Sequence, residues 1–226
     1  SFGLLGPNGA GKSTTMKMIG AVSTRTGGEL SVLGLDPDRL GPEIRSRLGV
    51  VPQQDNLDGE LNARENLFIY GRYFGLPAKV CHEKADELLA FAQLEDKAKS
   101  KVDALSGGMK RRLTIARGLI NDPRILLLDE PTTGLDPQAR HVLWDRLFRL
   151  KERGTTLLLT THYMDEAEQL CDRIVVVDKG QIMAEGTPAS LIRDHSSREV
   201  LEVRFGSEHN QQVAPRLAGI GDRVDV

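Results

Sequence analysis

The sequence lacks the features that mark membrane-spanning, disulfide-bonded or nucleic-acid-binding chains. Its two cysteines, Cys81 and Cys171, match no metal or redox spacing, and we expect both to be reduced thiols on helices. The formal net charge of −2 gives no electrostatic case for nucleic acid or anionic lipid as the main ligand. The longest apolar runs, such as Ile125–Leu128, have strand length, far below the roughly 20 residues that a membrane-spanning helix needs.

No signal peptide, internal repeat or low-complexity tract is visible. Because Ser1 lies inside an expected strand, we expect the natural N-terminus to lie upstream. The 226 residues suffice for one α/β domain with a sizeable core and a small appendage. The hydrophobic share of 39% and the charged share of 27% fit a soluble globular protein.

A phosphate-binding loop is the clearest motif in the chain. Residues 6–13 fit the pattern G-x-x-x-x-G-K-[ST], which leads from an apolar strand into a helix. The backbone N–H groups of such a loop can all face one anion, and a helix starting near Lys12 adds its positive end. Lys12 would reach the β/γ-phosphates, and the Ser13 hydroxyl would ligate Mg²⁺. The residues expected to bind the nucleotide are Gly6, Pro7, Asn8, Gly9, Ala10, Gly11, Lys12, Ser13 and Thr14.

Strands and helices alternate after this loop, which predicts a mostly parallel, doubly wound α/β core. A helical block, from about residue 62 to 120, is expected to be inserted into it. A further short strand at 199–205 and a helix at 213–217 would begin a C-terminal appendage, residues 196–226. The core strands after the first are expected at 27–34, 48–52, 124–129, 155–160, 173–177 and 181–184.

An acidic pair ends the expected strand 124–129. A hydrophobic strand that delivers an acid at its carboxyl end places Asp129 where ligands bind in open α/β sheets. Asp129 suits Mg²⁺, usually held through water, and Glu130 suits polarisation of an attacking water. The alternative is an ordinary strand-to-turn exit, which is less favoured after a phosphate loop.

The segment Leu105–Met109 forms a third candidate site. Ser106 can cap a helix, and the two following glycines leave N–H groups open to an anion. A plain helix cap would explain the same residues. Arg111 and Arg112 are expected on a solvated helix face, without a chemical role.

Taken in order, these motifs resemble the nucleotide-binding domain of ATP-binding cassette (ABC) transporters. The resemblance covers about residues 1–188 and implies a P-loop NTPase core with an inserted helical subdomain and a partial antiparallel β subdomain. It implies an ABC ATPase domain over residues 1–195. The similar segments are the Walker A loop at Gly6–Thr14, the signature at Leu105–Met109, Walker B at Ile125–Glu130, the Q-loop at Gln53, the D-loop at Asp136 and the switch histidine at His162.

The family implies ATP hydrolysis with Mg²⁺ as cofactor. Ser13 and Gln53 would ligate the metal, together with Asp129. Glu130 would orient water, and His162 would contact the γ-phosphate. Since Gln54 competes with Gln53 for the same role, we choose Gln53, which follows the strand more directly.

The signature also implies an assembly. In the family, Ser106, Gly107 and Gly108 of one subunit close on the ATP of the other, with Asp136 near the seam. The expected partners are a second ATPase subunit, in a homodimer, and an integral-membrane permease; no nucleic acid is expected. A coupling helix of the permease would enter the groove near Gln53 and helices 62–94. The family implies that the protein is peripheral, on the cytoplasmic face of the inner membrane.

Two departures from the family pattern stand out. Met109 replaces the commoner Gln of the signature, which exporter-type subfamilies tolerate. The family's adenine-stacking aromatic lies upstream of the phosphate loop, outside this chain.

Short segments such as Asp55–Asp58 and Gly71–Gly75 resemble exporters with a separate permease. The nearest of these are the nodulation-factor export and daunorubicin-resistance ATPases, and we favour the nodulation type.

Other functions remain as alternatives. A soluble ABC ATPase acting on ribosomes or DNA would carry two cassettes joined by a charged linker, or a long coiled coil, and neither feature is present. A regulatory module without turnover is a third possibility, which the intact Glu130 and His162 argue against.

Overall fold

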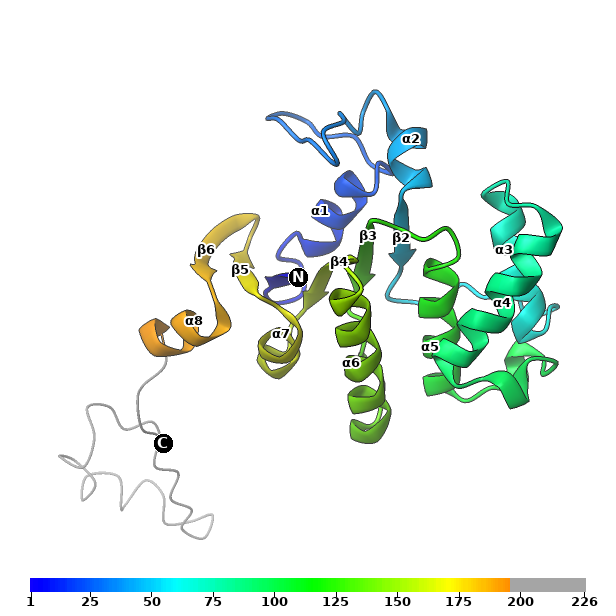
Figure 1. Ribbon diagram of the computed structural model, residues 1–226. Helices are drawn as coiled ribbons and strands as arrows, with labels where there is room; N and C mark the ends of the chain where they lie inside the picture. Colours follow the sequence, from blue (N-terminus) through cyan, green and yellow to red (C-terminus); the bar gives the residue numbers. More distant parts are fainter. Residues whose placement is uncertain (196–226) are drawn as a thin grey trace, which may run out of the picture. The chain divides into compact units, whose positions relative to one another are not determined.

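The computed structural model describes residues 1–195, in which helices flank a single six-stranded sheet (Figure 1). The chain divides into two units, residues 1–191 and 192–226, and the sheet belongs to the first. The strand and helix predicted at 199–205 and 213–217, and the appendage 196–226 itself, lie outside the described residues.

The sheet is mostly parallel, as predicted, with the strand order β2-β3-β4-β1-β5-β6. Neighbours from β2 to β5 run parallel, whereas β6 pairs antiparallel with β5. Leu126, Leu127 and Leu128 are all buried, because helices cover both faces and each side chain meets a helix. The strands are β1 Phe2–Leu5, β2 Leu48–Val51, β3 Ile125–Asp129, β4 Thr156–Thr161, β5 Arg173–Asp178 and β6 Gln181–Gly186.

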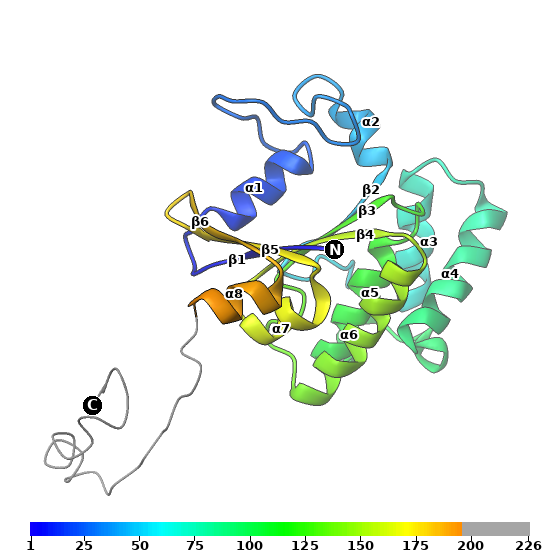
Figure 2. The ribbon, with the colours of Figure 1, turned by 60° about the vertical axis from the view of Figure 1, so that its left-hand side comes forward.

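Helices lie on both sides of this sheet. Figure 2 shows α1 and α2 on one side, and α5, α6 and α7 on the other. Met16 of α1 and Ile44 of α2 pack on Leu127, while the larger core cluster lies on the opposite face. The helices are α1 Lys12–Ile19, α2 Gly41–Ser46, α3 Ala63–Tyr73, α4 Ala78–Ala92, α5 Gly107–Gly118, α6 Pro137–Glu152, α7 Met164–Leu170 and α8 Pro188–His195, with 3₁₀ turns at Glu95–Lys97 and Val102–Ala104.

The predicted helical block consists of α3, α4 and α5, which contact one another, and α5 also contacts β2 of the sheet (Figure 1). Asn62 starts α3 through a capping box, in which its side chain accepts from the Glu65 N–H and the Glu65 carboxylate accepts from the Asn62 N–H. The helical block therefore begins near residue 62, where the sequence predicts its start. Among the described residues, no helix is both long and apolar enough to span a bilayer.

The predicted strand at 27–34 is wrong. This segment contributes only an isolated bridge between Val32 and Leu35 within the described residues. Leu33 and Gly34 have φ values of 55° and 81°, so the chain turns back before an extended run can form. Among the named strands of residues 1–195, β5 and β6 form the antiparallel pair.

Helix α8 was not predicted, although the sequence carries a signal for it. Pro188 occupies its first position, and the Thr187 hydroxyl accepts a hydrogen bond from the Ser190 N–H at 3.1 Å. A threonine cap followed by proline is a common helix start.

Candidate functional site

The strand order brings the predicted site residues to one edge of the sheet. The strands β3, β4 and β1 are parallel neighbours, so their carboxyl ends meet at the same edge. The phosphate loop follows β1, Asp129 ends β3, and His162 follows β4. Gln53 comes two residues after β2, which pairs with β3. Four segments far apart in the sequence therefore meet at one place.

The phosphate loop uses its glycines in two different ways. Gly9 and Gly11 have φ values of 82° and 104°, in the left-handed region where a Cβ is disfavoured. Gly6 is needed for space instead: a Cβ there would lie 2.1 Å from the carbonyl oxygen of Val177 in β5. Helix α1 then starts at Lys12, and no side chain in the described part of the chain caps it. Its first N–H groups are thus open to an anion.

Lys12 lies inside this loop with only 5% of its surface exposed. Its ammonium donates hydrogen bonds to the carbonyl oxygens of Gly6 at 2.7 Å and Pro7 at 3.0 Å. The same Nζ lies 3.9 Å from Oε1 of Glu130. A buried positive charge next to open N–H groups is suited to a polyanion.

Ser13 and Asp129 lie together, as a shared metal would require. The Ser13 hydroxyl donates to Oδ1 of Asp129 at 3.2 Å, and the Thr160 hydroxyl donates to the same oxygen. Over residues 1–195 there is no group of three or more His, Cys, Asp or Glu side chains that could hold a metal by themselves. A hydroxyl and one carboxylate fit Mg²⁺, which is usually held by few protein ligands, waters and substrate phosphates.

Glu130 lies at the centre of the site and is 7% exposed. Its Oε2 accepts hydrogen bonds from the side chains of Gln53 and Thr133, both at 3.0 Å. Its Oε1 lies 3.4 Å from Nδ1 of His162. The structure therefore brings together Gln53, Lys12 and His162 around one carboxylate.

The backbone of Glu130 is strained. Its φ is 44°, a left-handed conformation that costs a residue with a side chain about 1–3 kcal/mol. The Glu130 N–H is held by the carbonyl and hydroxyl oxygens of Thr160, both at 3.1 Å. Such strain persists only where surrounding contacts enforce it, and it is common at functional sites.

The signature residues and Asp136 form local helix caps. Ser106 accepts from the Met109 N–H at 3.3 Å, and Asp136 accepts from the Ala139 N–H at 2.9 Å. A Cβ on Gly108 would lie 3.4 Å from that of Ala139, so the starts of α5 and α6 are neighbours. Within residues 1–195, neither Ser106 nor Asp136 hydrogen-bonds to the phosphate loop. Their predicted contact with nucleotide stays a prediction.

The prediction that Arg111 lies on a solvated helix face is wrong. Arg111 is 3% exposed, and its guanidinium donates to five backbone carbonyl groups near Glu130. The helical periodicity could have indicated its burial, because Arg111 lies on the same face of α5 as the buried Thr114 and Gly118. The positive charge of the side chain hid this pattern, since charged residues are rarely buried without partners. Arg112, in contrast, is half-buried, and its guanidinium donates to the Ala92 carbonyl oxygen.

Glu166 is a second buried charge that the sequence analysis missed. Its side chain in α7 is 1% exposed, and within residues 1–195 neither of its oxygens has a hydrogen-bond partner. Burial raises the pKa of Glu166, while Thr161, Thr132, Trp144 and Arg140 act in the opposite direction. Glu166 therefore lies where α7, which follows His162, packs against α6, which follows Asp136.

Comparisons with known proteins agree with this arrangement. The family model described as ABC transporter matches residues 1–133. Nod factor export ATP-binding protein I of Burkholderia lata is 54% identical over 202 residues, which cover 89% of this chain and 66% of that protein. The protein of the same name from Paraburkholderia xenovorans is 53% identical over 227 aligned positions, with 100% and 73% covered. The chain thus spans only part of the length of both relatives.

Two solved structures are also similar. A dimeric ATP-binding cassette in a post-hydrolysis state with ADP and Pi is 33% identical, with a TM-score of 0.74 and 83% and 84% of the two chains covered. An ATP-binding subunit of an ABC transporter is 32% identical, with a TM-score of 0.76 and 88% and 83% covered.

Proposed function

The chain belongs to the ABC transporter family, and we propose that it is the ATP-binding and ATP-hydrolysing subunit of an export complex. The observation that carries this proposal is the set of contacts around Glu130. A carboxylate held by Gln53 and flanked by Lys12 and His162 is suited to orient a water beside a bound triphosphate. The alternative of a soluble ATPase acting on ribosomes or DNA is not favoured, because the similar proteins carry export names.

Each side chain has a distinct part in the proposed hydrolysis. Lys12 and the first N–H groups of α1 would neutralise the β/γ-phosphates. Ser13, Asp129 and Gln53 would hold Mg²⁺, which supplies charge neutralisation on the phosphates when it is bound. Glu130 would orient the attacking water, and His162 would stabilise the charge that develops on the γ-phosphate. Catalysis in this scheme rests on positioning and electrostatics.

Dimerisation would complete the site. The dimeric cassette of similar fold carries ADP and Pi, which supports a role for two subunits in the cycle. Ser106, Gly107 and Gly108 lie at the start of α5, and Asp136 lies at the neighbouring start of α6. We assign these residues to contacts with the ATP of the partner subunit. ATP binding would close the dimer, and hydrolysis would reopen it.

A groove at the sheet edge is our candidate for the permease contact. It has a volume of about 470 Å³ and lies between β2, α2 and α3. Among its lining residues, Tyr73 is 79% exposed and Val50 is 42% exposed, so apolar surface is accessible there. A helix from an integral-membrane permease would fit this chemistry. The ATPase would then be peripheral, on the cytoplasmic face of the membrane, and the cargo would be a Nod-factor-type molecule handled by the permease.

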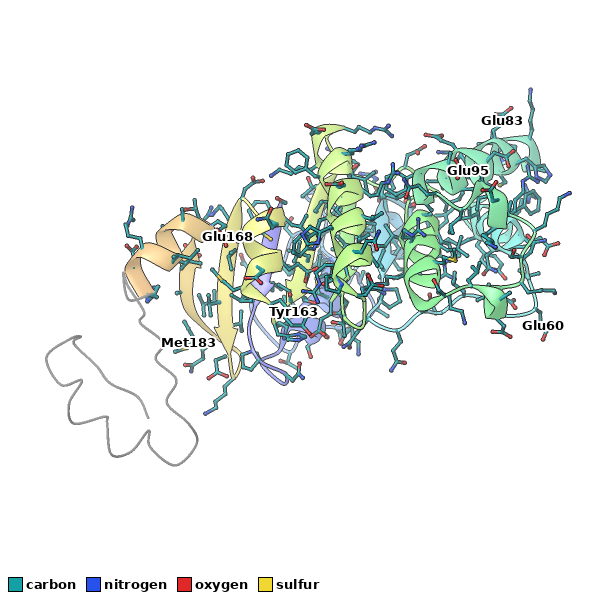
Figure 3. All side chains as sticks on the ribbon, turned by 90° about the horizontal axis from the view of Figure 1, so that it is seen from below. Glu60, Glu83, Glu95, Tyr163, Glu168 and Met183 are labelled. Carbon is teal, nitrogen blue, oxygen red and sulfur yellow. The ribbon has the colours of Figure 1, made fainter. Side chains whose placement is uncertain are left out.

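The substitution Glu130→Gln in the full-length protein tests the proposed chemistry. We expect ATP binding to persist, while hydrolysis falls by about 100- to 10,000-fold, because the amide cannot accept a proton from water. A nucleotide-bound dimer should accumulate in size-exclusion chromatography. Glu83→Gln is the matched control, and Figure 3 shows Glu83 at the outer end of the helical block, far from Tyr163 beside the site. Unchanged turnover in Glu130→Gln would contradict the role of Glu130.

The transport proposal needs a separate experiment. The full-length protein should sediment with membranes only when its permease is co-expressed. Ribosome-dependent ATPase activity in the absence of membranes would favour the alternative instead.

A further inference from the structure

We propose that Arg111 is a positioning residue for ATP hydrolysis, which fixes the backbone on either side of Gln53 and Glu130. Its guanidinium has five N–H donors, and five contacts to backbone carbonyl oxygens match that number. Nε donates to Pro131 at 2.7 Å. One terminal nitrogen donates to Pro52 at 2.5 Å and Gln53 at 3.2 Å, and the other to Asp129 at 3.1 Å and Glu130 at 3.2 Å.

The five carbonyl groups belong to only two segments. Pro52 and Gln53 follow β2, whereas Asp129, Glu130 and Pro131 end or follow β3. Beyond Val51 and Leu128, β2 and β3 no longer pair with each other. The planar guanidinium takes over the connection, because its donors point outward in a fixed fork that can reach both sides at once. The Gln53–Glu130 side-chain hydrogen bond forms between the same two segments.

This contact bears directly on the strained residue of the site. The Glu130 N–H is held by Thr160, and the Glu130 carbonyl oxygen is held by Arg111. With both ends of the residue fixed, its left-handed φ of 44° is maintained, and the carboxylate keeps its direction. Without Arg111, the segment can relax and turn the carboxylate away from its place.

A nearby carboxylate partly offsets the energetic cost of burying the positive charge of Arg111. Oδ1 of Asp55 lies 3.6 Å from a terminal nitrogen of the guanidinium. The Thr114 hydroxyl, one turn further along α5, donates to the same Asp55 oxygen at 2.9 Å. A buried arginine is a poor source of stability compared with apolar packing, so its use here points to a demand for geometry.

The position of Arg111 on α5 gives this contact a second consequence, which rests on the proposed function. Ser106 caps the start of α5, where we place the contact with the partner's ATP. Arg111 lies about one and a half turns further along the same helix. Movement of the signature end of α5 would therefore pass through Arg111 to Glu130 of the subunit's own site.

The test is the kinetics of Arg111→Gln and Arg111→Lys in the full-length protein. We expect kcat to fall on the order of 100-fold in Arg111→Gln, because a small displacement of Glu130 suffices for such a loss. The Kd for ATP, measured by titration calorimetry, should change less than about threefold, since the phosphate loop is untouched. Arg111→Lys keeps the charge but not the fork, and its kcat should lie between those of Arg111→Gln and the wild type.

Arg112→Gln is the matched control on the next position of the helix. Its guanidinium donates to the Ala92 carbonyl oxygen at 2.7 Å, in the helical block away from Glu130. We expect a wild-type kcat. As a further readout, Arg111→Ala should regain part of its kcat when millimolar guanidinium is added, which a purely structural loss would not show.

Several outcomes would overturn the inference. If the Arg111 variants hydrolyse ATP at the wild-type rate per folded molecule, or if they lose only thermal stability, Arg111 does not position the site. If guanidinium fails to rescue Arg111→Ala and Arg111→Lys is as slow as Arg111→Gln, the fork is not the reason for the loss. A wild-type protein without ATPase activity would instead contradict the proposed function itself.

Discussion

The side-chain amide of Gln53 donates a hydrogen bond to Oε2 of Glu130 at 3.0 Å. The two residues are 77 positions apart in the chain, and each follows a different strand of one parallel pair. Because the segment with Gln53 leads into the helical block, this bond connects that block to the carboxylate proposed to orient water. A shift of the helical block relative to the sheet would change the position of the Glu130 carboxylate.

Gln53→Ala should slow hydrolysis without abolishing ATP binding. The variant removes one of the two side-chain hydrogen bonds that Oε2 of Glu130 accepts, and a proposed metal ligand as well. We expect kcat to fall about 10- to 100-fold, which steady-state phosphate release would measure. Gln54→Ala is the matched control and should keep the wild-type rate. The reverse result would transfer the role to Gln54.

Lys12→Met should weaken nucleotide binding. Lys12 is buried in the phosphate loop, and a hydrogen bond between charged groups is worth about 1.5–3 kcal/mol. The Kd for ATP should therefore rise about 10- to 100-fold in a fluorescent-nucleotide titration. Lys17→Met, at an exposed position of the same helix, should bind as the wild type does. Equal affinities for the two variants would show that the loop does not bind the phosphates through Lys12.

His162→Ala should lower kcat more than it changes the Kd for ATP. Nδ1 of His162 lies 3.4 Å from Glu130, and the residue is proposed to stabilise charge that develops during the reaction. Loss of one such group costs roughly 100- to 1,000-fold in kcat. Single-turnover measurements separate this effect from nucleotide release. His82→Ala, on the exposed surface of α4, serves as the control, and a similar loss there would contradict a specific role for His162.

Glu166→Gln should stabilise the fold increasingly as pH rises. Burial raises the pKa of Glu166 above its ordinary value of 4.5, so the folded state holds the proton more tightly than the unfolded chain. Below pH 4.5 Glu166 is protonated in both states, and its effect on the free energy of unfolding is most favourable there. Above pH 4.5 the unfolded chain ionises first, so the free energy of unfolding falls until Glu166 ionises in the folded state as well. Glutamine has nearly the same shape and no charge, so it avoids that loss.

Urea unfolding of the two proteins at pH 5 and pH 8 would measure this effect. The stability advantage of Glu166→Gln should be larger at pH 8. Glu168→Gln, at an exposed position of the same helix, should show no such trend. An advantage independent of pH would mean that the carboxylate is not penalised by burial.

Most of the architecture could be predicted, because each element carries a local signal. The apolar run before Asp129 predicts a strand covered on both faces, and β3 confirms it. The parallel sheet, the helical block and the ABC family are likewise confirmed. The prediction of a strand at 27–34 failed because a short segment between glycine turns does not reveal whether the chain has a partner strand to pair with.

Sequence patterns indicated candidate site residues only where chemistry and motif coincide. Lys12, Asp129 and Glu130 lie in patterns whose spacing has a physical meaning, and they lie together in the structure. Arg111 and Glu166 follow no such pattern, because their environment is built by segments distant in the sequence. A charged residue on a helix is assigned to solvent unless the tertiary contacts are known.

The close approach of Gly6 to the carbonyl oxygen of Val177 means that the phosphate loop is not a transplantable part. The sequence of the loop suits the ligand, but the backbone against which Gly6 packs belongs to β5. This strand begins more than 160 residues after Gly6 in the chain. A designer who grafts residues 6–14 onto another strand–helix junction must also reproduce a neighbouring backbone at that spacing. The same constraint limits how far β5 can shift relative to the phosphate loop without a clash at Gly6.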